Sequence, residues 1–76
     1  ELSSEYSMAE TAVPQKWVGH SLAELKIREK FGLNVVGIIQ NEEVKVVLNP
    51  QEPLPEDGIL IIIGANSVLE KFHTES

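Results

Sequence analysis

Residues 21–40 of this 76-residue chain, SLAELKIREKFGLNVVGIIQ, carry its strongest signals of secondary structure. Ser21 and Glu24 form a capping box, in which the serine side chain accepts a hydrogen bond from an early helix N–H and the glutamate reaches back. The box predicts a helix over residues 22–30, and Gly32 supplies the left-handed residue that ends it. We expect a strand directly after that glycine.

The rest of the chain carries shorter strand and helix signals. Residues 34–40 are apolar on both faces and predict a central strand, while residues 43–49 alternate and predict its hairpin partner. Residues 59–63 have no polar face. This predicts a strand in the middle of the sheet that is covered on both of its faces. In the alternating segment, residues 43–49, we expect three side chains to face inward: Val44, Val46 and Leu48. The expected strands are residues 8–13, 34–40, 43–49 and 59–63, and the last helix covers residues 68–73.

These elements predict one small α+β domain of order β-α-β-β-β-α, with a mainly antiparallel sheet packed with two helices. We assign residues 1–7 to a linker, residues 8–73 to the domain and residues 74–76 to a tail. The chain begins at Glu1 rather than Met, so we expect it to be a piece of a longer protein.

The composition favours association between copies. Hydrophobic residues make up 42% of the chain, which also has no cysteine and two histidines. A chain this short buries only about 60 to 65% of its unfolded surface, and neither disulfides nor a Cys/His zinc site can add stability. We therefore expect a homodimer. The lack of cysteine also fits a reducing cytoplasm.

Several function classes are disfavoured. The formal charge is −6, whereas a nucleic-acid binder needs a basic face. The longest apolar run, residues 59–63, is too short to span a membrane. The first residues do not have the basic-then-apolar pattern of a signal peptide. No P-loop, HExxH or GxSxG motif is present, so we expect neither an enzyme nor a cofactor. His20 and His73 lack the spacing of metal ligands.

The predicted first helix contains one misfit. Leu22 and Leu25 share a stripe that faces the core, and Ile27 lies almost opposite it at 100° per residue. One interpretation is that the helix ends early and Ile27 folds back into the core. The other leaves Ile27 exposed to a partner subunit or ligand beside Lys26 and Arg28, where it suits a flat, aromatic, anionic molecule.

The neighbouring polar residues are open to two interpretations each. Arg28 follows Glu24 by four positions and fits a surface ion pair, as well as an anion site. Asn34 fits a turn residue after the glycine, and also a hydrogen-bonding group across a dimer axis. Pro50 fits a strand terminator, and its flat ring also fits a lid over an aromatic base.

The ordered series of motifs resembles the RCK C-terminal domain, also called TrkA-C, from about residue 8 to residue 72. The motifs that carry the resemblance are GHSL (19–22), AEL (23–25), IR (27–28), FGLNVV (31–36), Pro50, LPEDG (54–58), IIIG (61–64) and LEKF (69–72). The resemblance implies a domain that follows a nucleotide-binding RCK domain in the gating subunit of a Trk/Ktr-type potassium transporter, or in a related channel or antiporter. It also implies a cytoplasmic location at the inner face of the cell membrane, and contact with the membrane subunit through the rest of the protein.

Within that family the chain looks most like the gating subunits whose C-terminal domains dimerise and bind cyclic di-AMP on the two-fold axis. The resemblance implies that the adenines lie against aliphatic groups and the phosphates against an arginine presented twice. It also implies reduced potassium uptake on binding. Some relatives have an acidic residue at Lys26 and a basic one at Gln40, and Lys26 would add positive charge near the phosphates. The expected cyclic di-AMP site consists of Lys26, Ile27, Arg28, Asn34, Val35 and Pro50.

Two alternatives stay open. One is a structural dimerisation module without a ligand of its own, with regulation located in the nucleotide-binding domain. The other is a divalent-cation sensor that uses the acidic loop residues, because some members of the family bind such cations. Those residues are Glu42, Glu43, Glu52, Glu56 and Asp57.

Overall fold

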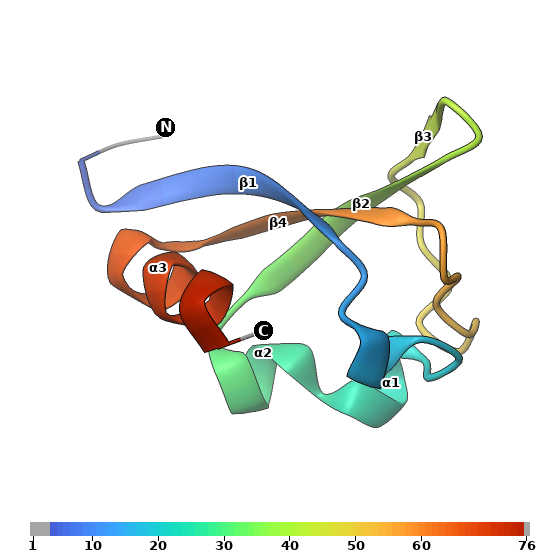
Figure 1. The fold of residues 1–76 in the computed structure, drawn as a ribbon, viewed down its shortest axis with the longest axis horizontal. Helices are drawn as coiled ribbons and strands as arrows, with labels where there is room; N and C mark the ends of the chain where they lie inside the picture. Colours follow the sequence, from blue (N-terminus) through green and yellow to red (C-terminus); the bar gives the residue numbers. More distant parts are fainter. Residues whose placement is uncertain (1–3, 76) are drawn as a thin grey trace.

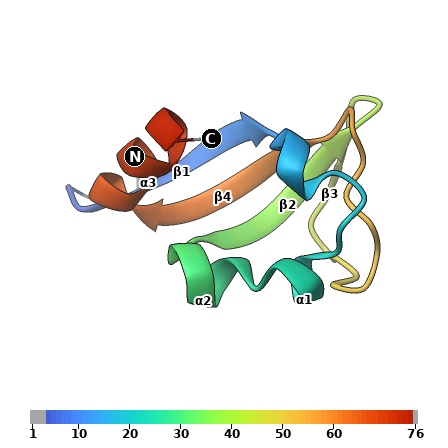
Figure 2. The ribbon, with the colours of Figure 1, turned by 60° about the horizontal axis from the view of Figure 1, so that its bottom comes forward.

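The computed structural model describes residues 4–75, which form a four-stranded sheet with every helix on one of its faces (Figure 1, Figure 2). The predicted α+β class and the antiparallel sheet are confirmed. None of the helices within this span has the length and hydropathy that a membrane crossing needs. In chain order the elements are β1 (Tyr6–Ala12), the 3-10 helix η1 (Gln15–Trp17), α1 (Leu22–Leu25), α2 (Ile27–Phe31), β2 (Asn34–Gln40), β3 (Glu43–Lys45), β4 (Ile59–Ala65) and α3 (Asn66–Glu75).

The strands lie in the order β1-β4-β2-β3, and each neighbouring pair is antiparallel. The two strands predicted to be central, β2 and β4, are the inner pair. Their register shifts between Val35 and Gly37, as in a β-bulge, which bends its strand and increases the local twist. Gly37 has little room for a side chain, because an added Cβ would lie 3.1 Å from Ile61 Cδ1.

The core lies between the sheet and the helices. Leu60 and Ile62 point from β4 into this layer, where they meet Leu33 from the turn before β2. A Cβ on Gly64 would stand only 2.5 Å from Leu33 Cδ2, so Leu33 packs directly over that glycine. Burying each large apolar side chain contributes about 1.5 to 3 kcal/mol. The buried core residues are Val13, Trp17, Ile27, Leu33, Leu54, Leu60 and Ile62.

The other face of the sheet has no helix over it. Ile59 is 38% exposed there, and Tyr6 and Met8 of β1 are also exposed. The expectation that residues 59–63 are covered on both faces is therefore wrong for one face. A fully apolar sequence predicts an inner strand of the sheet. In this chain, however, the helices cover only one face of the sheet.

β3 is shorter than predicted, because pairing with β2 stops at Ile38–Lys45 rather than running on to residue 49. The register shift between Val35 and Gly37 lies just beyond that pair, in the pairing of β2 with β4. Val44 is 60% exposed, and Val46 lies outside the strand and is also exposed. The expectation that both valines face inward is wrong.

The element boundaries also differ at the two ends. β1 begins at Tyr6, so two residues of the expected linker belong to the sheet. α3 spans Asn66–Glu75 and takes in most of the expected tail, residues 74–76. Residues 1–3 and 76, which fall in the predicted linker and tail, lie outside the described residues.

Candidate functional site

Lys26 divides the helix that the sequence predicted over residues 22–30. Its φ and ψ are both 50°, in the left-handed region, between the end of α1 and the start of α2. The break turns Ile27 inward to 4% exposure. A left-handed residue other than glycine costs about 1 to 2 kcal/mol, and burying an isoleucine gains about 1.5 to 3 kcal/mol, so burial is large enough to offset the strain.

The prediction of an exposed Ile27 is therefore wrong, and the interpretation that it folds back into the core is confirmed. Leu22 and Leu25 of α1 pack against the same core, half-buried. Because α1 and α2 are separate short helices, the three side chains no longer need to share one helical stripe.

The start of α1 has the predicted capping box. Ser21 Oγ accepts a hydrogen bond of 3.1 Å from the Glu24 N–H, and the Ser21 N–H donates to Glu24 Oε1 at 3.4 Å. His20 Nδ1 lies 2.9 Å from Glu24 Oε2. The hydrogen bond with His20, followed by the one from the Ser21 backbone, lowers the pKa of Glu24 below its ordinary value of 4.5.

The loop that follows β3 returns to α1 at Pro50. The Ala23 N–H donates a hydrogen bond of 2.9 Å to the Pro50 carbonyl. This bond satisfies one of the free N–H groups at the helix start. It also holds the proline ring beside α1, although Pro50 does not end β3, which stops five residues earlier at Lys45.

Arg28 reaches across the turn to the first residue of β2. Gly32 ends α2 with φ 71° and ψ 24°, and its N–H donates to the Arg28 carbonyl at 3.0 Å. The chain then reverses, and Arg28 Nε donates a hydrogen bond of 3.0 Å to Asn34 Oδ1. The alternative ion pair from Arg28 to Glu24 is replaced by this contact, since Glu24 binds His20 instead.

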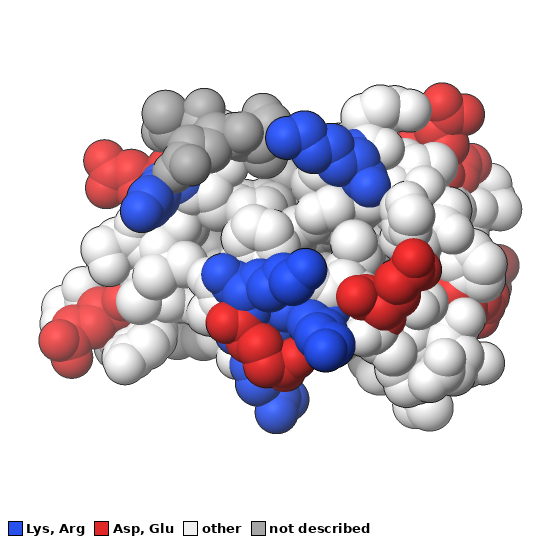
Figure 3. All heavy atoms as spheres, turned by 90° about the horizontal axis from the view of Figure 1, so that it is seen from below, with Lys and Arg blue, Asp and Glu red and all other residues white. Residues whose placement is uncertain are grey.

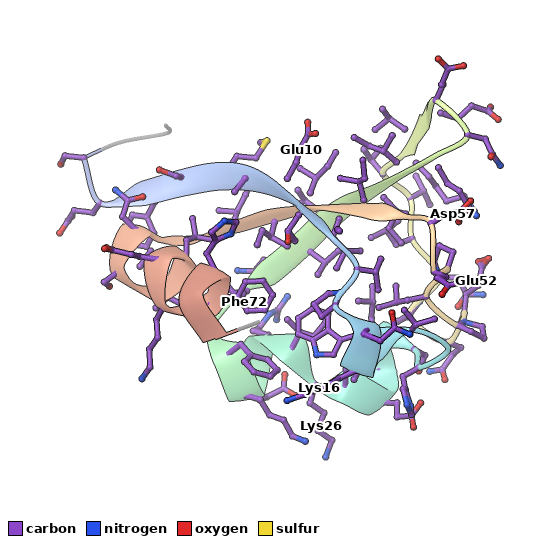
Figure 4. All side chains as sticks on the ribbon, viewed as in Figure 1. Glu10, Lys16, Lys26, Glu52, Asp57 and Phe72 are labelled. Atoms are coloured by element: carbon purple, nitrogen blue, oxygen red, sulfur yellow. The ribbon has the colours of Figure 1, made fainter. Side chains whose placement is uncertain are left out.

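All six predicted site residues line one hollow of about 240 Å³, open to solvent, between α1, α2, the start of β2 and the Pro50 turn. Ile27 forms part of its inner wall, and Lys26 extends from the helical layer away from the sheet (Figure 4). Four further lining residues were not predicted from the sequence, although the capping box, which fixes the first turn of α1, indicates the position of two of them. These are Leu22, Ala23, Glu29 and Leu33.

The hollow carries more positive than negative charge. Lys26 and Arg28 are its basic side chains, and Glu29 is its acidic one, in a chain of formal charge −6. Basic and acidic atoms lie side by side near the centre of the lower face in Figure 3. This arrangement favours an anion of low charge, because Glu29 offsets part of the attraction.

Among the described residues, the acidic loop residues form no cluster that could hold a divalent cation. In the part of the chain that the structure describes, no group of three or more His, Asp or Glu side chains is placed to hold a metal ion. Lys45 Nζ lies 4.0 Å from Glu52 Oε2 at the surface, and Gln40 Nε2 donates to Asp57 Oδ1 at 2.9 Å.

Fold and sequence together define the class. The chain matches the TrkA-C domain over residues 8–75, and it belongs to this family. Proteins of potassium transport carry this domain, which is also called the RCK C domain.

Two curated relatives are potassium uptake proteins. The chain is 36% identical over 72 residues to the Ktr system potassium uptake protein C of Bacillus subtilis (strain 168), covering 95% of this chain and 33% of that protein. It is 27% identical over 75 residues to the Ktr system potassium uptake protein A of the same organism, covering 99% of this chain and 34% of that protein. The chain spans about a third of the length of these relatives.

Solved structures agree with the fold. The RCK C domain of the potassium transport protein KtrA, in complex with cyclic diadenosine monophosphate, superposes with a TM-score of 0.83 at 31% identity, covering 93% of this chain and 84% of that one. The RCK C domain dimer of S. agalactiae BusR, also in complex with cyclic di-AMP, has a TM-score of 0.71 at 17% identity, covering 92% of each chain. The second likeness shows the fold alone.

Proposed function

We propose that this chain is the regulatory domain of a cytoplasmic gating subunit for potassium transport, and that two copies bind one cyclic di-AMP between them. The observation that carries the proposal is the hollow in which Arg28 and Asn34 are hydrogen-bonded to each other beside Pro50 and Val35. The complex of the KtrA domain with the same dinucleotide, at 31% identity, supports it.

The size of the hollow supports sharing between two chains. Its volume of about 240 Å³ is below the range of about 300 to 1,000 Å³ typical of small-molecule sites. Cyclic di-AMP is itself two-fold symmetric, with two phosphates and two adenines. A two-fold dimer would present the same half-site twice and match that symmetry.

Each lining residue then has a chemical role. The Arg28 guanidinium has terminal N–H groups besides Nε, and these would donate charge-assisted hydrogen bonds to one phosphate. Lys26 would add a second positive charge nearby. Val35 and Pro50 would contact the adenine, and the largely buried Ile27 would support the floor under it.

The exposed valines support association between chains. Val44 and Val46, with the neighbouring Val47, are exposed near the edge of the sheet. Clustered exposed apolar residues mark contact surfaces. A second copy of the chain, which the composition also favours, would cover part of this surface in the proposed homodimer.

Regulation follows from differential binding. A ligand shifts a conformational equilibrium only by its different affinities for the two arrangements. Cyclic di-AMP held between two domains would favour one relative orientation of the subunits, and the attached parts of the protein would transmit it to the membrane transporter subunit at the inner face of the membrane. We expect this to reduce potassium uptake.

Isothermal titration calorimetry with cyclic di-AMP tests the proposal on the chain and two variants. Arg28→Ala should weaken binding by about 10- to 100-fold, since a hydrogen bond to a charged group contributes about 1.5 to 3 kcal/mol. Lys71→Gln is the matched control, because it also removes one positive charge but lies on α3, outside the hollow and away from the exposed valines.

The control should bind as the unmodified chain does. No heat at tens of micromolar protein with the dimer intact would favour the structural dimerisation module instead. A response to calcium or manganese but not to cyclic di-AMP would favour the cation sensor. Equal losses of affinity in both variants would show that only overall charge matters, and would contradict the proposed site.

A further inference from the structure

A second hollow lies on the same face of the sheet, between η1, the end of α2 and α3. Its volume is about 730 Å³, three times that of the cyclic di-AMP candidate and within the range of about 300 to 1,000 Å³ typical of small-molecule sites. None of its residues lines the first hollow. The lining residues are Pro14, Gln15, Lys16, Trp17, Lys30, Phe31, Ser67, Val68, Lys71 and Phe72.

Three aromatic rings form an apolar wall of this hollow. The ring centroids of Trp17 lie 5.4 Å from those of both Phe31 and Phe72, with tilted planes. The two phenylalanine rings meet edge to face at 6.3 Å. Phe31 remains 40% exposed, so the cluster presents aromatic surface to the outside rather than closing on itself.

Three lysines stand around the aromatic wall, each from a different element. They are Lys16 of η1, Lys30 of α2 and Lys71 of α3. The chain has only six basic residues, so half of them border one hollow, and all ten lining residues are free of acidic side chains. Figure 4 shows Lys16 and Phe72 on the lower side of the sheet, where the helices lie.

This distribution is unusual for a chain of charge −6. Lysine stems often cover apolar surface while the ammonium stays in water, and one such lysine would need no further explanation. Here three lysines from separate elements surround aromatic rings, of which Phe31 is still exposed. Together they create a site with an apolar base and a positive border. Figure 3 shows basic atoms bordering surface that carries no charge on this face.

We propose that this hollow binds a small amphipathic organic anion, with an aromatic or branched apolar body and a single acid group. The body would lie against Trp17, Phe31 and Phe72, where stacking and edge contacts are favourable. The carboxylate, sulfonate or phosphate would lie among the lysine ammonium groups. A neutral molecule would gain only the first of these contributions.

The site is distinct from the cyclic di-AMP hollow but adjoins it through α2. Ile27, Arg28 and Glu29 of that helix line the first hollow, while Lys30 and Phe31 line the second. The two sites therefore share a helix of five residues. The second site does not depend on the first, and it can be tested without the dinucleotide.

Trp17 is the only tryptophan, so it reports on the hollow directly. The experiment titrates the 76-residue chain with anilinonaphthalene sulfonate, an aromatic anion, and follows energy transfer from Trp17 together with the NMR shift of its indole N–H. The uncharged analogue phenylnaphthylamine is the matched probe. The sulfonate should bind at least about tenfold more tightly, because it alone reaches the ammonium groups, and added salt should reduce the difference.

The charge requirement is tested in a triple variant, Lys16→Gln, Lys30→Gln and Lys71→Gln. All three side chains are exposed, so the fold should persist, as circular dichroism will show. The variant should lose the preference for the sulfonate, whereas Lys45→Gln should keep it. Equal affinity for both probes, an unchanged preference in the triple variant, or no shift of the Trp17 indole N–H would overturn the proposal.

Discussion

Arg28 and Asn34 are joined by a hydrogen bond of 3.0 Å from Nε to Oδ1, across the turn at Gly32. The contact links α2, which follows the break at Lys26, to the first residue of β2. It fixes the direction of an exposed guanidinium before any ligand arrives, and such preorganisation lowers the entropic cost of binding. The pair is the structural basis of the proposed anion site.

This contact predicts that the two residues act as a unit on ligand affinity. Asn34→Ala should weaken cyclic di-AMP binding although the asparagine carries no charge, because Arg28 loses its orientation. In a double-mutant cycle by calorimetry, the double variant should lose about 0.5 to 3 kcal/mol less than the sum of the single variants. Strict additivity would show that Asn34 does not position Arg28.

The buried position of Ile27 makes a prediction about stability. Ile27→Ala should lower the free energy of unfolding by about 2 to 5 kcal/mol, because it opens a cavity in the core. Gln15→Ala shortens an exposed side chain on η1, and should change the free energy of unfolding by less than about 0.5 kcal/mol. Urea denaturation of both variants at one protein concentration measures the difference; equal effects would contradict the inward turn at Lys26.

Gly32 allows a separate test of the turn before the site. Its φ is 71° and no atom lies within 4 Å of the position of an added Cβ, so only backbone conformation matters there. Gly32→Ala should destabilise the domain by about 1 kcal/mol, while Gly32→Asn should cost less, because asparagine tolerates left-handed conformations. Thermal unfolding of the two variants gives the comparison. A larger loss for asparagine would exclude this explanation.

Much of the fold could be predicted from local sequence. The capping box at Ser21, the stop at Gly32 and the apolar strand at residues 34–40 each depend on neighbouring residues alone, and each is present. The break at Lys26 could not be predicted this way. Lysine has no preference for a left-handed backbone, and the break is compatible with stability because the burial of Ile27 offsets the backbone strain.

The alternating segment after residue 43 shows a second limit. Alternation predicts which valines share a side but not which side is covered, and here Val44 lies on the open face. Alternation also does not show where pairing ends, and β3 stops at Lys45 although the alternation continues to residue 49. The six expected site residues do line one hollow, while their role in ligand binding stays a prediction.

The capping network at α1 should depend on pH through Glu24. Its pKa is lowered from 4.5, first by the hydrogen bond with His20. A depressed pKa means that ionised Glu24 contributes stability above about pH 4.5, and that this contribution is lost as the pH falls through the folded pKa. An NMR titration should place the Glu24 midpoint below 4.5 and return it toward that value in His20→Ala; an identical midpoint in both would contradict the assigned cause.

The stoichiometry of cyclic di-AMP binding shows directly whether two chains share one ligand. Calorimetry at a chain concentration well above the dissociation constant counts the ligands bound at saturation. A ligand shared across a two-fold axis predicts one cyclic di-AMP for every two chains. Saturation at one ligand per chain, or no binding at all, would contradict the account.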